Sequence, residues 1–282
     1  MLDDVVGYLQ CPRCRAALRR DGQALRCPAG HSFDIARQGY VSLLPPGGRA
    51  PGGDSAAMVT ARASFLDEGH YAGVAGELAR RAATAAQRVP GCVADVGAGP
   101  GYYLAAVLGQ LPGRAGLALD ASKFALRRAA RAHPRIGAVA ADAWRRLPVA
   151  GGAAAVVLNV FAPRSGPELR RILHPRGRLL VVTPGPGHLG ELVGPLGLLA
   201  VDPRKDERLM ATLGACFDLQ ERDEYAAGLR LDHDAVAAAV GMGPSAWHAD
   251  PAALGERIGQ LPGQVPVTVA VTISVFRPRG RA

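Results

Sequence analysis

Four side chains near the start of the sequence have the types and the spacing of a zinc site. The two pairs are Cys11-x2-Cys14 and Cys27-x3-His31, with twelve residues between them. Three thiolates and one imidazole at this spacing can converge tetrahedrally on one Zn²⁺. The chain has five cysteines, an odd number that argues against a disulfide framework and for metal or thiol roles. The sequence therefore predicts a bound zinc ion.

The segment between the two pairs predicts a hairpin. Asp21-Gly22 stands at its middle, and this dipeptide is typical of tight hairpin turns. A DNA-reading zinc finger needs a helix there and two histidines after it. A thioredoxin-like Cys-x-x-Cys needs a framing strand and helix that the sequence lacks. We interpret the module as a zinc ribbon that displays Arg13, Arg15, Arg19 and Arg20 to a partner.

A second stretch with chemical potential is the glycine-rich segment "DVGAGPGYY". Residues 92–96 predict a short apolar strand, Gly97, Gly99 and Gly101 a loop, and residues 102–111 a helix. Strand, glycine loop and helix in this order form the first unit of a doubly wound α/β fold. Glycines allow a ligand to lie against bare backbone. The loop is therefore a candidate cofactor site.

The identity of the cofactor depends on what surrounds this loop. A dinucleotide fingerprint would place glycine or alanine where Tyr102 stands, which weakens the case for a nicotinamide cofactor. The pattern Asp-x-Gly-x-Gly-x-Gly is instead similar to motif I of class I S-adenosylmethionine (SAM) methyltransferases. Asp95, Asp120 and Asp142 follow three successive predicted strands, where acids can accept ribose hydroxyls or an adenine amine.

Other segments must position these groups. The Pro/Gly stretch 45–54 predicts a linker. Asp54 and Ser55 predict a helix start, with Asp54 favoured as the N-cap, and a second helix follows over about 72–88. We expect a zinc-binding ribbon at 1–37, a linker and helix start at 38–62, and a catalytic domain at 63–282.

The second half of the chain predicts further strands. Residues 153–163 form a strand that ends in "NVFAP", so Asn159 either meets a base edge or caps the strand. Residues 179–183 form the next, followed by a Gly/Pro loop with His188. The alternation in 266–276 predicts a late antiparallel strand, whereas 202–234 shows no clear order.

Composition and charge bound the class of protein. The 282 residues are 49% hydrophobic, no run of 18 apolar residues appears, and the first residues are acidic rather than basic. We expect a globular protein in the cytoplasm with no membrane partner. The net charge is +9, and residues 122–178 hold twelve Lys and Arg against two acids. This regional charge favours a polyanionic partner.

Taken together, these motifs resemble one family over nearly the whole chain. The resemblance rests on "CPRC", "CPAGHSFDIARQGYVSLL", "GDSAAM", "ARASFLDEGHY", "DVGAGPGYY", "NVFAP" and "TPGPGHLGEL". The chain is similar to the bacterial 23S rRNA guanine-N1 methyltransferases, especially the actinomycete branch that confers resistance to tylosin and related macrolides. The resemblance implies a Rossmann-like class I SAM-dependent methyltransferase fold with a small N-terminal zinc ribbon. It also implies a homodimer whose cleft holds a 23S rRNA hairpin.

The family pattern carries over residue by residue. Cys11, Cys14, Cys27 and His31 match its zinc ligands. With the motif residues above, the positions expected to contact SAM are Tyr71, Asp95, Gly97, Gly99, Pro100, Gly101, Asp120, Asp142 and His188. The chain departs from the family at Ala98 to Pro100, where other members carry Cys and Glu. For the antibiotic-producer branch, the resemblance implies that the methylated base is the guanine at nucleotide 748, in a hairpin lining the peptide exit tunnel. The alternative is the guanine at the neighbouring nucleotide 745.

Methylation at guanine N1 adds one requirement, because this nitrogen carries a proton. A carboxylate is the natural base, and Asp54 is the candidate, with Asn159 orienting the base and Phe161 stacking on it. Two other hypotheses stay open at this point. A small-molecule methyltransferase with a purely structural zinc module would show weak salt dependence, and a non-catalytic zinc RNA-binding regulator would fail to bind SAM.

Overall fold

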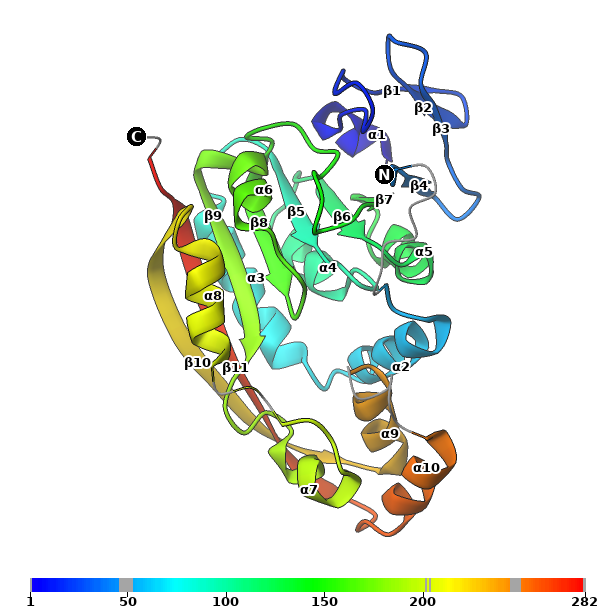
Figure 1. Cartoon of the computed structure of the whole chain (residues 1–282), viewed down its shortest axis with the longest axis vertical. Helices are drawn as coiled ribbons and strands as arrows, with labels where there is room; N and C mark the ends of the chain where they lie inside the picture. Colours follow the sequence, from blue (N-terminus) through cyan, green and yellow to red (C-terminus); the bar gives the residue numbers. More distant parts are fainter. Residues whose placement is uncertain (1, 46–52, 201, 203, 244–249, 281–282) are drawn as a thin grey trace.

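The core of the protein is one mixed β-sheet. The computed structural model describes residues 2–45, 53–200, 202, 204–243 and 250–280. In this part of the chain eight strands form a sheet of order β10-β11-β9-β8-β5-β6-β7-β4 (Figure 1). The strands are β4 (Tyr40–Ser42), β5 (Cys92–Val96), β6 (Gly116–Asp120), β7 (Ile136–Ala140), β8 (Ala154–Val160), β9 (Leu173–Pro184), β10 (Phe217–Leu231) and β11 (Val265–Pro278). Strands β4 to β9 pair in parallel, whereas β11 runs antiparallel to β9 and β10. The predicted α/β fold and the late antiparallel strand are confirmed.

Helices cover both faces of this sheet because side chains alternate along each strand. On β8, Leu158 belongs to one hydrophobic core and Val157 to the other. The first face is covered by α3 (Ala72–Ala85), α4 (Tyr102–Gly109) and α5 (Lys123–Ala132). The opposite face is covered by α1 (Leu2–Val5), α6 (Gly166–Ile172) and α8 (Lys205–Leu213). The remaining helices are α2 (Ala56–Asp67), α7 (Val193–Leu196), α9 (His233–Gly241) and α10 (Pro251–Gly259). None of the described helices has both the length and the apolar character to span a membrane.

The N-terminal module is a small three-stranded antiparallel sheet. It consists of β1 (Arg19–Asp21), β2 (Ala24–Arg26) and β3 (Ser32–Asp34). Gly22 makes the turn between the first two strands with a φ of 58°, in the left-handed region that glycine tolerates. The hairpin predicted from the sequence is therefore confirmed.

This module is attached firmly to the main sheet. The backbones of Leu9 and Val149 form an antiparallel bridge, and two hydrogen bonds, Gln10 N–H to Pro148 O (3.0 Å) and Ala150 N–H to Tyr8 O (2.8 Å), flank it. Leu2 and Val5 of α1 are buried in the same core as the sheet residues of that face. Strand β4, inside the segment predicted as a linker, pairs with β7. The division at 1–37, 38–62 and 63–282 remains a proposal.

The start of α2 corrects one expectation. Ser55, not Asp54, is the N-cap: its Oγ accepts a hydrogen bond from the Met58 N–H at 3.2 Å. Asp54 lies one residue too early for that role, and its carboxylate pairs with Arg62 instead. Residues 46–52 of the predicted linker lie outside the described residues.

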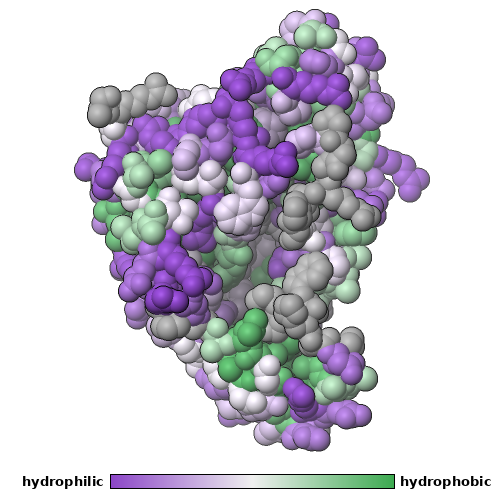
Figure 2. Space-filling model, viewed as in Figure 1, coloured by the Kyte–Doolittle hydropathy of each residue, from purple (hydrophilic) through white to green (hydrophobic). Residues whose placement is uncertain are grey.

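Strands β10 and β11 extend beyond the parallel part of the sheet (Figure 1). Strand β9 leads to α7, β10 leads to α9, and α10 leads back into β11. Helix α9 contacts α2, which links this lower arm back to the main domain. In the space-filling view the face is hollowed between the sheet and this arm (Figure 2). The region 202–234, for which the sequence predicted no clear order, contains α8, all of β10 and the start of α9.

Candidate active site and metal centre

The predicted zinc ligands meet at one point of the ribbon. The four ligand atoms of Cys11, Cys14, Cys27 and His31 all lie within 4.8 Å of one another. The Sγ atoms of Cys14 and Cys27 are 3.6 Å apart, and His31 Nδ1 lies 3.5 Å from Cys11 Sγ and 3.4 Å from Cys27 Sγ. Zinc bonds of about 2.3 Å to sulfur and about 2.0 Å to nitrogen in a tetrahedron require ligand separations of roughly 3.5 to 3.8 Å. The donor set therefore fits Zn²⁺, with His31 binding through Nδ1.

Two glycines of the loop at residues 97–101 are packed too closely to accept a side chain. Gly97 and Gly101 have φ values of 80° and 85°. A Cβ on Gly97 would lie 2.3 Å from Cβ of Ala162, and one on Gly101 would lie 3.0 Å from Cα of Ala129. The loop is thus wedged between the start of α4, helix α5 and the segment after β8. Its bare backbone faces the carboxyl edge of the sheet, where parallel α/β sheets bind their ligands.

The three acids end consecutive strands at this edge, as predicted. Asp120 accepts hydrogen bonds from the Gly99 N–H and the Ser122 N–H, both at 2.8 Å. Asp142 follows β7 and accepts one from the Trp144 N–H at 2.9 Å. Asp120 therefore fixes the glycine loop to β6, the neighbouring strand.

Asp95 differs from the other two acids because its carboxyl group is isolated. Its side chain is buried, and neither carboxyl oxygen has a hydrogen-bond partner. Burial, and then the charge of Asp120, raise the pKa of Asp95 to about 8. A buried carboxyl group without a partner, beside a glycine loop, is suited to a ligand that carries positive charge, as the sulfonium and ammonium groups of SAM do.

Tyr71 and His188 form a hydrogen-bonded pair at the same edge. The Tyr71 hydroxyl and His188 Nε2 are 2.9 Å apart, although 117 residues separate them. His188 Nδ1 accepts from the Ala270 N–H at 3.2 Å, so the neutral ring carries its proton on Nε2 and donates to Tyr71. Burial lowers the pKa of His188 to about 4 and raises that of Tyr71. Both groups are therefore neutral at pH 7, and the Tyr71 O–H is free to donate to a ligand.

Phe161 lies next to this pair. Its ring centroid is 6.1 Å from that of Tyr71 and 5.9 Å from that of His188. The side chain is 39% exposed, and the residue has a φ of 50°, which is rare for a bulky side chain. The Phe161 N–H donates to Val182 O at 3.0 Å, so the strand pairing holds the residue in this conformation.

The two predicted catalytic residues have different surroundings. Asp54 pairs with Arg62, which also donates to Met242 O at 2.7 Å, and the Asp54 carbonyl accepts from Ser122 Oγ at 2.7 Å. Asn159 is fully buried and donates through Nδ2 to Val96 O and Pro163 O, both at 3.0 Å. Asn159 therefore holds the segment after β8 against β5. Its Oδ1 is buried without a partner.

Several residues near the site were missed by sequence analysis. Arg62 lies beside Gly99, with its guanidinium 3.8 Å from the position of a Cβ there. Trp144, two residues after Asp142, is 66% exposed and precedes the exposed Arg145 and Arg146. The Trp-Arg-Arg triplet was a usable signal, because exposed aromatic and basic residues together are typical of nucleic-acid contacts. Arg62, an ordinary position inside α2, offered no such signal.

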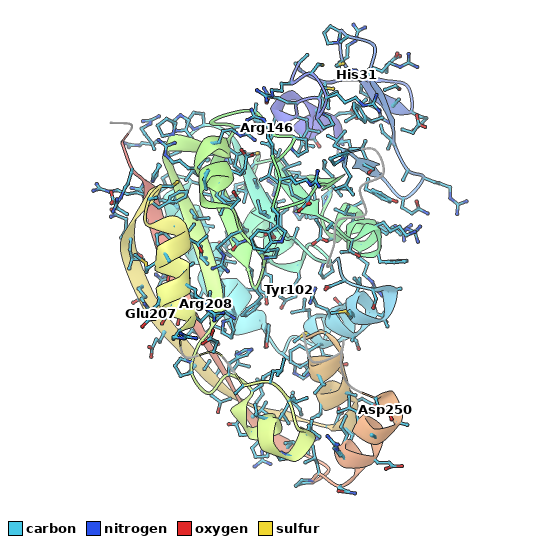
Figure 3. All side chains as sticks on the ribbon, viewed as in Figure 1. His31, Tyr102, Arg146, Glu207, Arg208 and Asp250 are labelled. Atoms are coloured by element: carbon cyan, nitrogen blue, oxygen red, sulfur yellow. The ribbon has the colours of Figure 1, made fainter. Side chains whose placement is uncertain are left out.

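The predicted basic surface is only partly available to a partner. Arg13, Arg15, Arg19 and Arg20 are exposed on the ribbon, with Arg20 paired to Asp3 at 2.7 Å. Figure 3 shows Arg146 between the zinc-binding module, which carries His31, and the main sheet.

Other arginines of the basic segment support the fold instead. Arg135 donates to three backbone carbonyls in the last turn of α4 and just after it, and Arg171 donates to the carbonyls of Leu147 and Val149. The net charge of 122–178 therefore overstates the charge that can face RNA.

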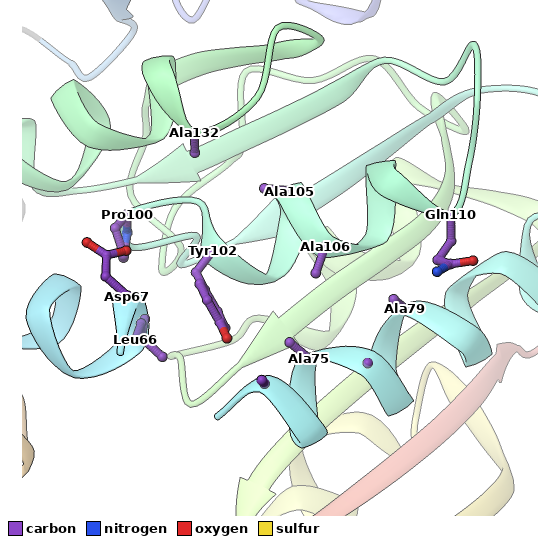
Figure 4. A pocket seen from close by; sticks show the side chains of 12 residues that line it. Leu66, Asp67, Ala75, Ala79, Pro100, Tyr102, Ala105, Ala106, Gln110 and Ala132 are labelled. Carbon is purple, nitrogen blue, oxygen red and sulfur yellow. The ribbon is translucent and has the colours of Figure 1, made fainter. Parts of the chain in front are cut away.

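A separate groove of about 530 Å³ lies between α3 and α4, behind the glycine loop. Figure 4 shows Tyr102 projecting into it from the start of α4, near Leu66 and Asp67. Alanines line most of its walls, and it includes none of the three acids at the strand ends. The groove is therefore separate from the edge of the sheet where these acids lie, although Pro100 of the glycine loop forms part of its wall.

Comparison with known proteins decides the family. A zinc-ribbon family model described as "RlmA, N-terminal" matches residues 9–47. The 23S rRNA (guanine(748)-N1)-methyltransferase of Streptomyces fradiae is 52% identical over 99% of both chains. A Micromonospora griseorubida protein, provisionally named as a 23S rRNA guanine-N1 methyltransferase, is 51% identical over 99% of this chain and all of its own.

The chain belongs to the 23S rRNA guanine-N1 methyltransferase family. The fold agrees: a solved structure from Bacillus halodurans C-125, provisionally described as a methyltransferase, aligns with a TM-score of 0.50. That alignment covers 71% of this chain and 97% of the other, at 16% identity.

Membership confirms the two expected bound groups. SAM is the methyl donor of the class I methyltransferase fold, and Zn²⁺ fits the ribbon cluster that the family model matches. A family member is an enzyme, so the nicotinamide, small-molecule and regulator hypotheses fall away. The individual SAM contacts, the base and the RNA contacts are developed below as proposals.

Proposed function

We propose that this methyltransferase modifies N1 of the guanine at nucleotide 748 of 23S rRNA, in the hairpin that lines the exit tunnel. The single observation that carries the choice of nucleotide is the 52% identity, over 99% of both chains, to the Streptomyces fradiae enzyme named for that position. Resistance to tylosin-type macrolides follows if the methyl group obstructs drug binding in the tunnel. The enzyme works in the cytoplasm, as a homodimer whose cleft receives the hairpin.

The nucleotide is tested directly by methylation. Purified protein is incubated with methyl-labelled SAM and unmodified 23S rRNA, and the product is mapped by reverse transcription. N1-methylguanine cannot pair normally, so the transcript should stop next to nucleotide 748. A stop next to 745 would assign the other site, and label on small molecules but not on rRNA would overturn the proposed substrate.

In this proposal the carboxyl edge of the sheet holds the donor. SAM supplies a methyl group on a sulfonium, ready for in-line displacement. Asp120 and Asp142 hold the ribose and adenine, and the backbone of Gly97 to Gly101 lies along the remainder of the donor. Tyr71, whose hydroxyl is held by His188, donates to the polar end of SAM. Asp95 contributes negative charge beneath the loop. The support for this assignment is that the three acids, the loop and the Tyr71–His188 pair all meet at one edge.

The acceptor guanine lies on the β8 side. Phe161 offers it an exposed ring, and a flipped-out base needs such a stacking surface. A positive φ on phenylalanine costs on the order of 1–3 kcal/mol, a strain typical of functional positions. Asn159 keeps this segment in place through Val96 and Pro163. Arg13, Arg15, Arg19 and Arg20 bind more distant phosphates of the hairpin.

Asp54 is the proposed base that removes the N1 proton. Asp120 and Asp142 already accept backbone hydrogen bonds, and Asp95 is sealed from solvent. The Asp54 side chain is 20% exposed and contacts a single cation, Arg62. It is therefore the carboxylate at this edge that can turn toward an incoming base.

The isolated carboxyl group of Asp95 makes donor binding depend on pH. With a pKa of about 8, Asp95 is almost fully protonated at pH 6, whereas a cationic ligand favours the ionised form. If only the ionised form binds, the Kd for SAM falls about tenfold per pH unit from pH 6 to pH 7 and levels off above pH 8. Calorimetric titrations across this range measure the trend.

The Asp95→Asn variant is the matched control for that measurement. It keeps the size of the side chain but cannot ionise. Its Kd for SAM therefore shows how much of the pH dependence comes from all other titrating groups, including the amine of SAM itself. Its Kd should vary less with pH than that of the wild type. Equal slopes for the two proteins would show that Asp95 does not sense the donor.

A further inference from the structure

Two basic side chains near the acceptor position have no part in the scheme so far. Arg164 follows the "NVFAP" segment at the end of β8, three residues after Phe161. Its Nη2 donates to Ala162 O at 3.1 Å, but its Nε is buried and has no hydrogen-bond partner. No carboxylate in the described part of the chain forms an ion pair with it. A buried guanidinium N–H without an acceptor is costly, and usually marks a place where a ligand completes the contacts.

Lys205 comes from a distant part of the sequence to the same region. It is the first residue of α8 and shares one helix face with Leu209 and Thr212, four and seven residues further on. Leu209 is buried, and the backbone of Gly166 packs so tightly on α8 that a Cβ there would lie 2.5 Å from Thr212 O. This face of α8 therefore lies along the segment that starts with Arg164. In Figure 3, Arg208 of the same helix lies at the level of the carboxyl ends of β8 and β9.

The charge of Asp202 favours protonated Lys205, but burial and the charge of Arg164 outweigh it. Asp202 pairs with Arg208 at 2.9 Å and accepts from the Arg204 N–H at 3.0 Å. Burial lowers the pKa of Arg164, and it also lowers the pKa of Lys205, which the charge of Arg164 lowers further. The charge of Lys205 in turn contributes to the low pKa of His188, after burial. Arg164 and Lys205 are thus partly buried cations whose charges act on one another, and the segment from Arg164 to Gly166 packs along the helix that Lys205 begins.

Such a pair is stabilised when an anion lies between its members. A guanidinium and an ammonium are the two groups that proteins use to bind phosphate oxygens. The carboxylate of SAM, at the donor end that Tyr71 meets in the proposed function, is the alternative anion, and the experiment below separates the two. An RNA strand that presents its guanine to Phe161 brings a phosphate to this side of the base.

We propose that Arg164 and Lys205 form a binding site for one backbone phosphate of the rRNA, next to the flipped-out target guanosine. The inference rests on the proposed function, since it requires RNA at this cleft. The site positions the nucleotide on the acceptor side, while the ribbon arginines contact the hairpin elsewhere. It accounts for the unsatisfied Nε of Arg164 and for the absence of a paired carboxylate around it in the described chain.

The test compares the wild type with the double variant Arg164→Gln/Lys205→Gln, using unmodified 23S rRNA as the probe. Binding is measured over a series of salt concentrations, and SAM binding is measured by calorimetry. The variant should bind rRNA about tenfold more weakly at low salt. The slope of log K against log salt should fall by about 0.7–0.9, the contribution of one phosphate. The Kd for SAM should be unchanged, which also shows that the variant is folded.

The control is Arg277→Gln/Arg279→Gln, which removes the same charge. Both arginines contact Asp218. Because β11 runs antiparallel to β9 and Val271 already pairs with Pro184 at the carboxyl end of β9, residues 277 and 279 lie away from the carboxyl edge of the parallel strands. This variant should keep the wild-type salt slope. An unchanged slope in the Arg164/Lys205 variant overturns the phosphate site and leaves the proposed function intact, and weaker SAM binding with normal rRNA binding reassigns it to the cofactor carboxylate. A wild type that fails to bind or methylate rRNA overturns both proposals.

Discussion

Replacing Cys27 by serine should release the zinc ion and lower the melting temperature of the whole protein by about 10 °C or more. Cys27 contributes one of four ligands, and its side chain is also buried in the core that α1 shares with the main sheet. Loss of the metal therefore loosens both the ribbon and one face of the sheet. Metal analysis and scanning calorimetry measure the two effects, and methylation of 23S rRNA should be lost with them.

Cys216→Ser is the matched control. Cys216 is a free, half-buried cysteine that lies outside the metal cluster and packs at the edge of the same core. Its replacement should leave one zinc per chain and a melting temperature close to that of the wild type. A Cys27→Ser protein that retains equimolar zinc would contradict the four-ligand site.

Replacing Asp54 by asparagine should slow methyl transfer by a factor of about 10² to 10⁴, the usual contribution of a general base. The side chain keeps its size but can no longer accept the N1 proton of guanine. Single-turnover rates at saturating SAM and rRNA measure the loss of the chemical step. The Kd for SAM should change little, because the backbone carbonyl of residue 54, which Ser122 contacts, is retained.

Arg62→Gln separates a chemical role of Asp54 from a structural one. Asp54 and Arg62 form an ion pair, so a purely structural Asp54 would act by holding Arg62 near Gly99. Both variants would then lose the same amount of activity, together with SAM affinity. We expect Arg62→Gln to retain most of the single-turnover rate. Equal losses in the two variants would remove Asp54 from the chemistry.

Local sequence patterns were sufficient to predict the elements whose structure depends on neighbouring residues alone. The strand at 92–96 was predicted with its observed bounds, because a short apolar run followed by three glycines permits few alternatives. The turn at Gly22 and the zinc cluster were likewise predictable, since ligand spacing and turn chemistry are local. The order of Asp95, Asp120 and Asp142 along one edge followed from the parallel topology alone.

Features that depend on long-range packing were not predictable. Strand β10 contains a charged run, Glu221 to Glu224, followed by small residues, so no strand pattern is visible in its sequence. Its identity comes from pairing with β11 further along the chain. Asp54 was expected to cap α2, but its carboxylate forms an ion pair with Arg62, which the folded helix places next to it. The Tyr71–His188 contact and the approach of Lys205 to the β8 side join residues that are far apart in sequence, and no local pattern encodes them.

The bridge between Leu9 and Val149 affects the order in which the protein can be completed during synthesis. Its two halves are about 140 positions apart, so the first helix leaves the ribosome long before the strands it must cover exist. Metal uptake by the first 31 residues can give the emerging segment a compact shape during that wait. We therefore expect chelation during translation to reduce the yield of native enzyme more than chelation after release does.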